Sequence, residues 1–199
     1  MRATKTDTET RQEQIAEAAM EMIATGGLAS LSITGIAERV GIVPSGVYRH
    51  YEGKEAVLDA VLDLLRSRLQ ANVEKVRGDT PGALARLRAL FTLHMRMLVG
   101  KPAFPYVVFD QFAQADRPER WVRLRDTMCA YVHEVVRIVE EGQLEEAIRA
   151  DIPPQTAAVM FIGLVLPAAM LHRLSEEDFD TSFYVDTAWP AFVRVLKVA

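Results

Sequence analysis

Residues 30–54 contain two short helical patterns separated by a glycine, and this arrangement restricts the fold more than any other feature of the chain. Ser32 precedes the first pattern, where its hydroxyl can accept a hydrogen bond from a free backbone amide. Gly41 follows the pattern, and glycine readily adopts the left-handed conformation that ends a helix in a sharp turn. Pro44 stands where a second helix, expected over residues 44–51, would begin. Two short helices joined by a tight turn form a helix-turn-helix, a unit that places its second helix in the major groove of DNA.

The second helical pattern carries polar side chains suited to nucleic acid. The Tyr48 hydroxyl and the His50 imidazole either donate to phosphate oxygens, which positions a protein without reading bases, or serve the fold alone. Arg49 either reaches a guanine edge, binds a phosphate or stays in solvent. Thr34 either contacts a base or does not reach the DNA. Small residues on the same face would let the helix enter the groove deeply. The residues expected to face DNA are Ser32, Thr34, Pro44, Ser45, Gly46, Tyr48, Arg49, His50 and Lys54.

The run IAERVGIVPSGVYRHYEGK, residues 36–54, resembles the TetR/AcrR-type bacterial transcriptional regulators. Their pattern is I-A-x-x-x-G, a short turn, Y-x-H-F, and a lysine that opens the next helix. The resemblance implies phosphate contacts from Tyr48, His50 and Lys54, the last at a helix N-terminus where the dipole attracts anions. The matching positions are Ile36, Ala37, Gly41, Tyr48, His50, Tyr51 and Lys54. Three positions depart from the pattern, Tyr51 in place of phenylalanine, Val43 in place of a capping serine, and Gly53 in place of serine or aspartate.

Composition places the chain among ordinary globular proteins, since 50% of its 199 residues are hydrophobic and 25% are charged. Cys129 is its one cysteine, which excludes an internal disulfide, and we expect this residue in the core of an apolar helix. The longest apolar run, residues 157–171, is interrupted by Pro167, so the sequence predicts a soluble cytoplasmic protein that does not engage a membrane. The formal net charge is −4, but residues 39–54 carry three basic residues against one acidic residue. Local charge decides contacts with DNA, because salt screens distant charges.

Apolar periodicity predicts an all-α fold of about nine helices. The first helix is expected to start with a capping box at Thr10 and Glu13 and to end at Gly26. Long helices are expected over residues 54–77, 80–100, 116–142, 155–174 and 181–196, with a short irregular helix within 101–115. Residues 1–53 would form the DNA-binding domain, and residues 54–199 a domain for effector binding and dimerisation. The helix over 54–77 would join the two without a flexible linker.

A group of aromatic residues and methionines in the second domain has two interpretations, a plain core or the lining of a cavity. Regulators of the TetR/AcrR type often bind a small effector among these helices, so the resemblance favours the cavity. Few charged residues lie nearby in the sequence, which indicates an apolar or amphipathic effector. The candidate ligand-binding residues are Phe91, Met95, Tyr106, Phe109, Phe112, Trp121 and Met128.

The helix over residues 155–174 is apolar on nearly every side, and this indicates a second cover beyond the chain's own core. Small residues within it would allow two helices to approach closely. Together with the last helix it would form a self-complementary four-helix interface of a homodimer. Internal packing is the alternative. The candidate interface residues are Ala157, Phe161, Leu164, Ala168 and Phe192.

No catalytic, metal or cofactor motif accompanies these features. His94, His133 and His172 fall on three different expected helices, without the close pair that metal sites usually show. The sequence therefore predicts a ligand-responsive repressor that acts as a homodimer on a near-palindromic operator and is not an enzyme. Two alternatives remain open. One is a helix-turn-helix protein that has lost DNA binding and serves as a protein-binding coactivator, and the other is a small helical enzyme or ligand carrier.

Overall fold

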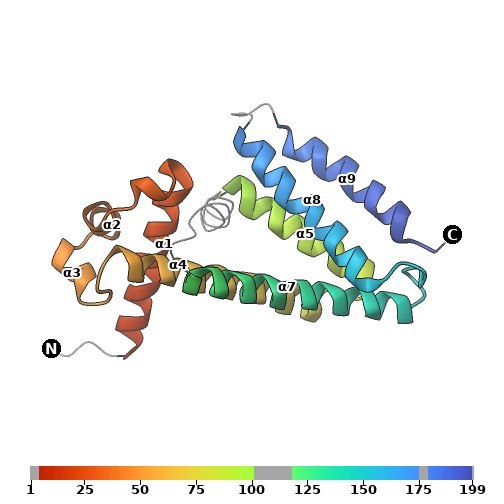
Figure 1. Cartoon of the computed structure of the whole chain (residues 1–199), viewed down its shortest axis with the longest axis horizontal. Coiled ribbons are helices and arrows are strands. Elements are labelled where there is room, and N and C mark those ends of the chain that lie inside the picture. The colour runs from red at the N-terminus through yellow and green to blue at the C-terminus, as the bar shows by residue number, and fades with distance from the viewer. Residues whose placement is uncertain (1–4, 101–117, 175–178, 199) are drawn as a thin grey trace. The chain divides into compact units, whose positions relative to one another are not determined.

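The computed structural model describes residues 5–100, 118–174 and 179–198 of the chain. Within these ranges the chain is helical, and one isolated antiparallel bridge joins Ile148 to Lys197. The all-α prediction is confirmed. Tyr106, Phe109 and Phe112 lie outside the described residues. The helices are α1 (Lys5–Gly26), the 3₁₀ turn η1 (Leu28–Ser30), α2 (Ile33–Val40), α3 (Pro44–Tyr48), α4 (Lys54–Asp79), α5 (Ala83–Gly100), α7 (Pro118–Leu144), α8 (Pro154–Leu174) and α9 (Thr181–Leu196) (Figure 1).

The described chain forms two compact units. Among the described residues, the N-terminal unit comprises 5–68 and 118–124, and the C-terminal unit comprises 69–100, 125–174 and 179–198. Helices α4 and α7 each contribute residues to both units, because the division falls within each helix. The chain therefore passes between the units without a linker at either place.

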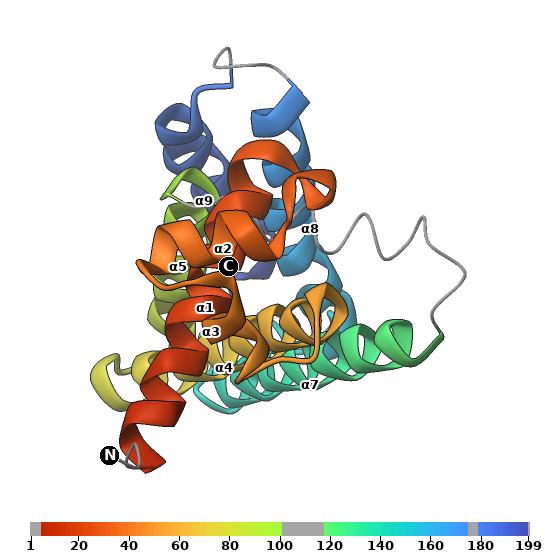
Figure 2. The same cartoon turned by 90° about the vertical axis from the view of Figure 1, so that its left-hand side faces the viewer.

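The N-terminal unit has one hydrophobic core, built by α1, α2, α3 and the first part of α4. Helix α2 packs on α1, and α3 packs on α2 (Figure 2). Ile15, Ile23, Ile36, Val47 and Val57 have no exposed surface and form the centre of this core. Burying one such aliphatic side chain contributes about 1.5–3 kcal/mol. The three short helical elements that follow α1 are thus held by shared packing rather than by their length.

The first helix differs from its prediction at the N-terminus. Helix α1 includes Lys5, so Thr10 lies inside the helix and the expected capping box at Thr10 is wrong. Residues 5–9 contain neither glycine nor proline to stop a helix from extending backward. At the other end Gly27 adopts a positive φ of 70°, directly after the helix.

In the C-terminal unit, α5, α8 and α9 pack on one another (Figure 1). Aromatic rings fill their shared core. Phe91 stacks on Trp189 with ring centroids 6.1 Å apart, and Phe161 lies 6.1 Å from Phe192. Helix α8 continues through Pro167 and α9 through Pro190. Cys129 is exposed on α7, so its expected place in the core is wrong.

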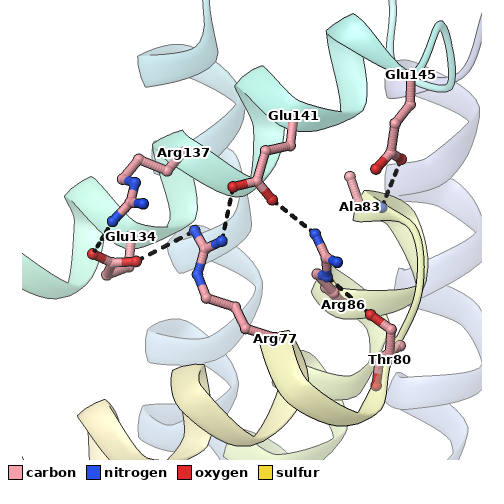
Figure 3. A network of polar contacts seen from close by, with 8 residues as sticks. All are labelled: Arg77, Thr80, Ala83, Arg86, Glu134, Arg137, Glu141 and Glu145. Carbon is pink, nitrogen blue, oxygen red and sulfur yellow. Dashed lines mark hydrogen bonds and ion pairs between the residues drawn. The ribbon is translucent and has the colours of Figure 1, made fainter.

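A polar network joins α4, α5 and α7 in the C-terminal unit (Figure 3). The Glu141 carboxylate accepts a hydrogen bond from Arg77 Nη1 at 2.7 Å and another from Arg86 Nη1 at 2.8 Å. Glu145 accepts from the backbone amide of Ala83 at 2.9 Å, at the start of α5. One carboxylate shared by two guanidinium groups fixes the end of α4 beside α7.

One helix, from Pro154 to His172, is long and apolar enough to cross a membrane by length and composition alone, with a mean hydropathy of 1.7. One third of this window is buried within the chain. The remaining part of this window of α8 is not buried within the chain. An apolar helix surface that stays exposed to solvent often marks an interaction site.

Candidate DNA interface

The turn between α2 and α3 has the geometry that the sequence predicted. Gly41 lies in the left-handed region at φ 73° and ψ 36°, and its amide donates to the carbonyls of Ala37 and Glu38. The amide of Ile42 donates to the Ala37 carbonyl at 2.9 Å. These bonds satisfy carbonyls that a helix end otherwise leaves without partners. Gly41 thus ends α2 and directs the chain into α3.

Ser32 caps α2, because its hydroxyl accepts from the amide of Gly35 at 3.1 Å. The expected cap is confirmed. Both Ser32 and Thr34 are exposed beside it. The cap occupies the acceptor side of the Ser32 hydroxyl and leaves its proton for another acceptor, such as a phosphate oxygen.

Helix α3 is shorter than predicted, since it ends at Tyr48 rather than near Tyr51. Val43 precedes it without a side-chain cap, and Pro44 occupies its first turn. Val47 is fully buried and anchors the helix to the core. Five residues give little helical stability of their own, so packing holds α3 in place.

Helix α3 contains four of the nine residues predicted to face DNA, and Arg49 follows its last residue. Pro44, Ser45 and Arg49 are exposed, and Tyr48 exposes 57% of its surface. A side chain added at Gly46 would place its Cβ 3.3 Å from Ile42 Cδ1. Glycine therefore allows the turn and the helix to pack closely at this point. The exposed residues of α3 and Arg49 after it occupy positions 44, 45, 48 and 49, the spacing of one helix face.

His50 and Tyr51 follow α3 and are both partly buried. The Tyr51 hydroxyl donates to the carbonyl of Gln12 on α1 at 3.2 Å. Burial, aided by the charge of Asp63, raises the pKa of Tyr51, which keeps the hydroxyl protonated as a donor. The phenol that replaces the usual phenylalanine therefore ties the end of the helix-turn-helix to α1.

Lys54 is exposed and is the first residue of α4. The carbonyl of Gly53 accepts from the amide of Val57 at 3.2 Å, but glycine has no side chain with which to cap the helix. The positive end of the helix dipole and the lysine charge therefore coincide at an exposed position. Such a helix end attracts phosphate.

A surface groove of about 580 Å³ lies between α1 and α4 in the N-terminal unit. Glu9, Glu13, Asp59 and Asp63 line it together with Tyr51. This acidic lining makes the groove less suited to phosphate than the surface around α3, although Asp59 and Asp63 also face arginines of α7. The polar face of α3 and the start of α4 remain the surface suited to DNA.

The candidate effector residues fall in different surroundings. Phe91 and Met95 are buried in the C-terminal unit, and Met128 is partly buried there. Trp121 belongs to the N-terminal unit and exposes 38% of its surface. The structure thus brings Phe91 and Met95 into one core, whereas Trp121 lies in the other unit with an exposed side chain.

The C-terminal unit also contains a buried polar pair that the sequence did not indicate. The Tyr131 hydroxyl lies 3.1 Å from Nε2 and 3.3 Å from Nδ1 of His94. Burial lowers the pKa of His94 to about 4 and raises the pKa of Tyr131. The imidazole is therefore neutral at physiological pH. The two residues lie on separate helices, and no local pattern in the sequence connects them.

Two helices joined by a glycine turn, with polar residues on the exposed face of the second, define a DNA-binding helix-turn-helix. Residues 15–61 match the family model described as "Bacterial regulatory proteins, tetR family". The resemblance to the TetR/AcrR-type regulators is thereby confirmed for the helix-turn-helix, and residues 15–61 mark the chain as a DNA-binding transcriptional regulator.

Individual proteins are similar to the chain over most of its length. The chain is 19% identical over 170 residues to the nucleoid occlusion factor SlmA of Vibrio campbellii, covering 85% of this chain and 86% of that protein. A TetR-family regulator from Agrobacterium tumefaciens has the same fold, with a TM-score of 0.81 at 16% identity over 96% and 100% of the two chains. The regulator FadR from Bacillus subtilis, solved with stearoyl-CoA, has a TM-score of 0.76 at 18% identity over 92% and 98%.

Proposed function

We propose that the protein is an effector-responsive repressor that binds a near-palindromic operator as a homodimer. Residues 1–53 would recognise DNA, and residues 54–199 would bind the effector and the second copy. The observation that carries this proposal is the exposed polar face of α3, held by the buried Val47 and the left-handed Gly41. The protein would act in the cytoplasm, on chromosomal DNA, as a regulator rather than an enzyme.

Contacts to DNA would divide into positioning and reading contacts. Tyr48, His50 and Lys54 would donate to phosphates, and Ser32 would add its hydroxyl from the start of α2. Arg49 would address a guanine edge, and Thr34, Pro44, Ser45 and Gly46 would line the groove. Two copies of α3 in adjacent major grooves require half-sites about 34–36 Å apart.

Exposed apolar residues on α8 and α9 support the homodimer. Ala157, Phe161, Ala168 and Phe192 are buried within their own chain, so they are unavailable to a partner, and Leu164 is partly buried. The exposed large apolar residues described on these two helices are instead Val159, Met160, Met170, Leu171, Phe183 and Val195. We therefore shift the proposed interface to these exposed residues. A second copy of the same two helices would cover them on both sides of a two-fold axis.

The effector would be amphipathic, with a long apolar part. Phe91, Met95 and Phe161 give the C-terminal unit an aromatic and aliphatic interior, while His94 and Tyr131 supply a polar pair within it. The regulator FadR, whose fold is similar, was solved with stearoyl-CoA, and this suggests a fatty acyl thioester as the first probe. The effector can change DNA affinity only by binding two conformations of the dimer unequally.

Selection of bound duplexes from a random DNA pool tests the proposal. The wild-type protein is expected to enrich a near-palindromic sequence, and Arg49→Ala to enrich a more relaxed one. Stearoyl-CoA added to the complex with the enriched duplex is expected to release the DNA. If a duplex is enriched but acyl-CoA of several chain lengths does not release it, the proposal that the protein binds an operator stands, and acyl-CoA is excluded as the effector class. A protein that folds and dimerises but enriches nothing would contradict the proposed function.

A further inference from the structure

Arg120, at the third position of α7, is the most deeply buried charged residue among those described in the N-terminal unit. Its side chain exposes only 7% of its surface. The guanidinium donates from Nη1 to Glu55 Oε2 at 2.5 Å, from Nη2 to the Glu55 carbonyl at 2.9 Å, and from Nε to Asp59 Oδ1 at 2.8 Å. Three different nitrogens are thus bonded to two successive turns of α4.

The contacts are strong enough to define a geometry. Burial lowers the pKa of Arg120, but the hydrogen bonds to Asp59 and Glu55 outweigh burial, and the pKa is raised. A buried charge with this many directed bonds is costly to leave without its partners. Arg123, one turn further along α7, lies 3.8 Å from Asp63, and both side chains are more than half exposed. Exposed pairs of that kind contribute little, so of these two ionic contacts Arg120 contributes more to holding α7 on α4.

The bonded turn of α4 is the one that begins with Lys54. Gly53 provides no side-chain cap for this turn. The hydrogen bonds from Arg120 on α7 therefore stabilise the start of α4 where a capping side chain would otherwise do so. Arg120 also offsets the charges of Glu55 and Asp59, which follow Lys54 on the first two turns of α4. Without Arg120 both carboxylates would keep an unbalanced negative charge on these turns, near the lysine that we propose to meet DNA.

We propose that Arg120 is a positioning residue for DNA binding, which acts by holding the first turn of α4 so that Lys54 meets a phosphate. The inference rests on the proposed function, because it assumes that the protein binds an operator. It adds a residue outside the helix-turn-helix to the determinants of that binding. It also gives α7 a direct mechanical connection to the DNA-binding surface.

A double-mutant cycle on the enriched duplex tests the inference, with Arg120→Gln, Lys54→Ala and the combined variant. Each single substitution is expected to weaken binding about tenfold. It is also expected to make the plot of log K against log salt less steep, by the amount that corresponds to about one lost phosphate contact per subunit. The combined variant is expected to bind within about twofold of Lys54→Ala alone, because Arg120 acts through Lys54. Losses that multiply in the combined variant would overturn the inference, since they would indicate an independent effect such as the changed net charge.

Arg123→Gln is the matched control, because it removes one arginine from the same helix and from a pair with the same partner helix. It is expected to leave both the affinity and the salt slope unchanged. Where Arg120→Gln melts below the assay temperature, Arg120→Lys takes its place in the cycle, with the same expected non-additivity. If the wild-type protein enriches no duplex, the proposed function fails and takes this inference with it. If the wild-type binds and the losses multiply, the inference fails alone.

Discussion

The hydroxyl of Tyr51 donates to the carbonyl of Gln12 at 3.2 Å, which joins the end of the helix-turn-helix to the first helix. Tyr48, three residues earlier, instead exposes 57% of its surface. We therefore expect Tyr51 to contribute to stability and Tyr48 to contact DNA. Tyr51→Phe is expected to lower the free energy of unfolding by about 1 kcal/mol and to leave operator affinity unchanged in the folded protein.

Tyr48→Phe is the counterpart. It removes an exposed hydroxyl, so the free energy of unfolding should stay within about 0.5 kcal/mol of the wild-type value. Operator affinity should fall, because a phosphate contact is lost. Urea unfolding and titration of a labelled duplex check the pair. A Tyr48→Phe variant that unfolds more easily but binds normally would reverse the assigned roles.

Gly41 is expected to be intolerant of a side chain because of its backbone rather than for lack of space. No atom lies within 4 Å of a Cβ built at this position, but its φ is 73°. Gly41→Ala should destabilise the protein by about 1–2 kcal/mol. Gly78→Ala is the control, since it also meets open space but lacks a positive φ and lies in α4. Thermal unfolding should show the control neutral or slightly stabilised, and equal losses in both variants would contradict this account.

His94 predicts a pH dependence of stability. Its pKa is about 4 in the folded chain, against 6.5 for an exposed histidine. As pH falls from 6.5 toward 4, the unfolded chain binds a proton that the folded chain excludes, so stability decreases. The loss attributable to this group is up to about 3 kcal/mol and is absent above pH 6.5.

The variant His94→Phe isolates this effect from the titration of carboxylates. The difference in unfolding free energy between wild type and variant should change through the window from pH 6.5 to 4 and stay constant above it. His133→Gln is the control, because that histidine is exposed on α7. If the free energy of unfolding of the wild type and of His94→Phe decreased in parallel toward low pH, His94 would not account for the loss of stability in acid.

The proposed dimer predicts a specific set of disruptive substitutions. Val159→Asp and Phe183→Asp place a charge on exposed apolar positions of α8 and α9. Because both side chains are exposed, the folded monomer does not depend on them for stability. Light scattering should report the mass of a monomer for both variants. Thermal unfolding at low protein concentration should show an unchanged midpoint. Val122→Asp, at an exposed apolar position of α7, should remain dimeric. Dimers in all three variants would place the interface elsewhere.

Local patterns predicted the helix-turn-helix closely. The cap at Ser32, the turn at Gly41 and the range of α9 all follow from signals carried by neighbouring residues. The same kind of signal failed at Thr10, because nothing in the preceding residues stops the helix. Helix α3 also ends earlier than predicted, at Tyr48, although the amides of His50 and Tyr51 still donate to the Val47 carbonyl.

Contacts between distant residues were beyond the sequence. Arg120 reaches Glu55 and Asp59 across more than sixty positions, and a lone arginine near a helix start carries no sign of such partners. Apolar periodicity likewise cannot distinguish a side chain covered by its own chain from one left for another copy. Phe161 and Met160 are neighbours on α8, yet the first is fully buried and the second exposes 37% of its surface.

The most direct test of the central claim is the affinity of the wild-type protein for the enriched duplex and for a scrambled duplex of the same composition, measured from 50 to 200 mM salt. Sequence-specific regulators prefer their site by about a thousandfold or more, and phosphate contacts make both affinities fall steeply with salt. The account predicts such a preference, maintained across the salt range. Equal affinities for the two duplexes would contradict it, because α3 would then be bound to DNA without reading it.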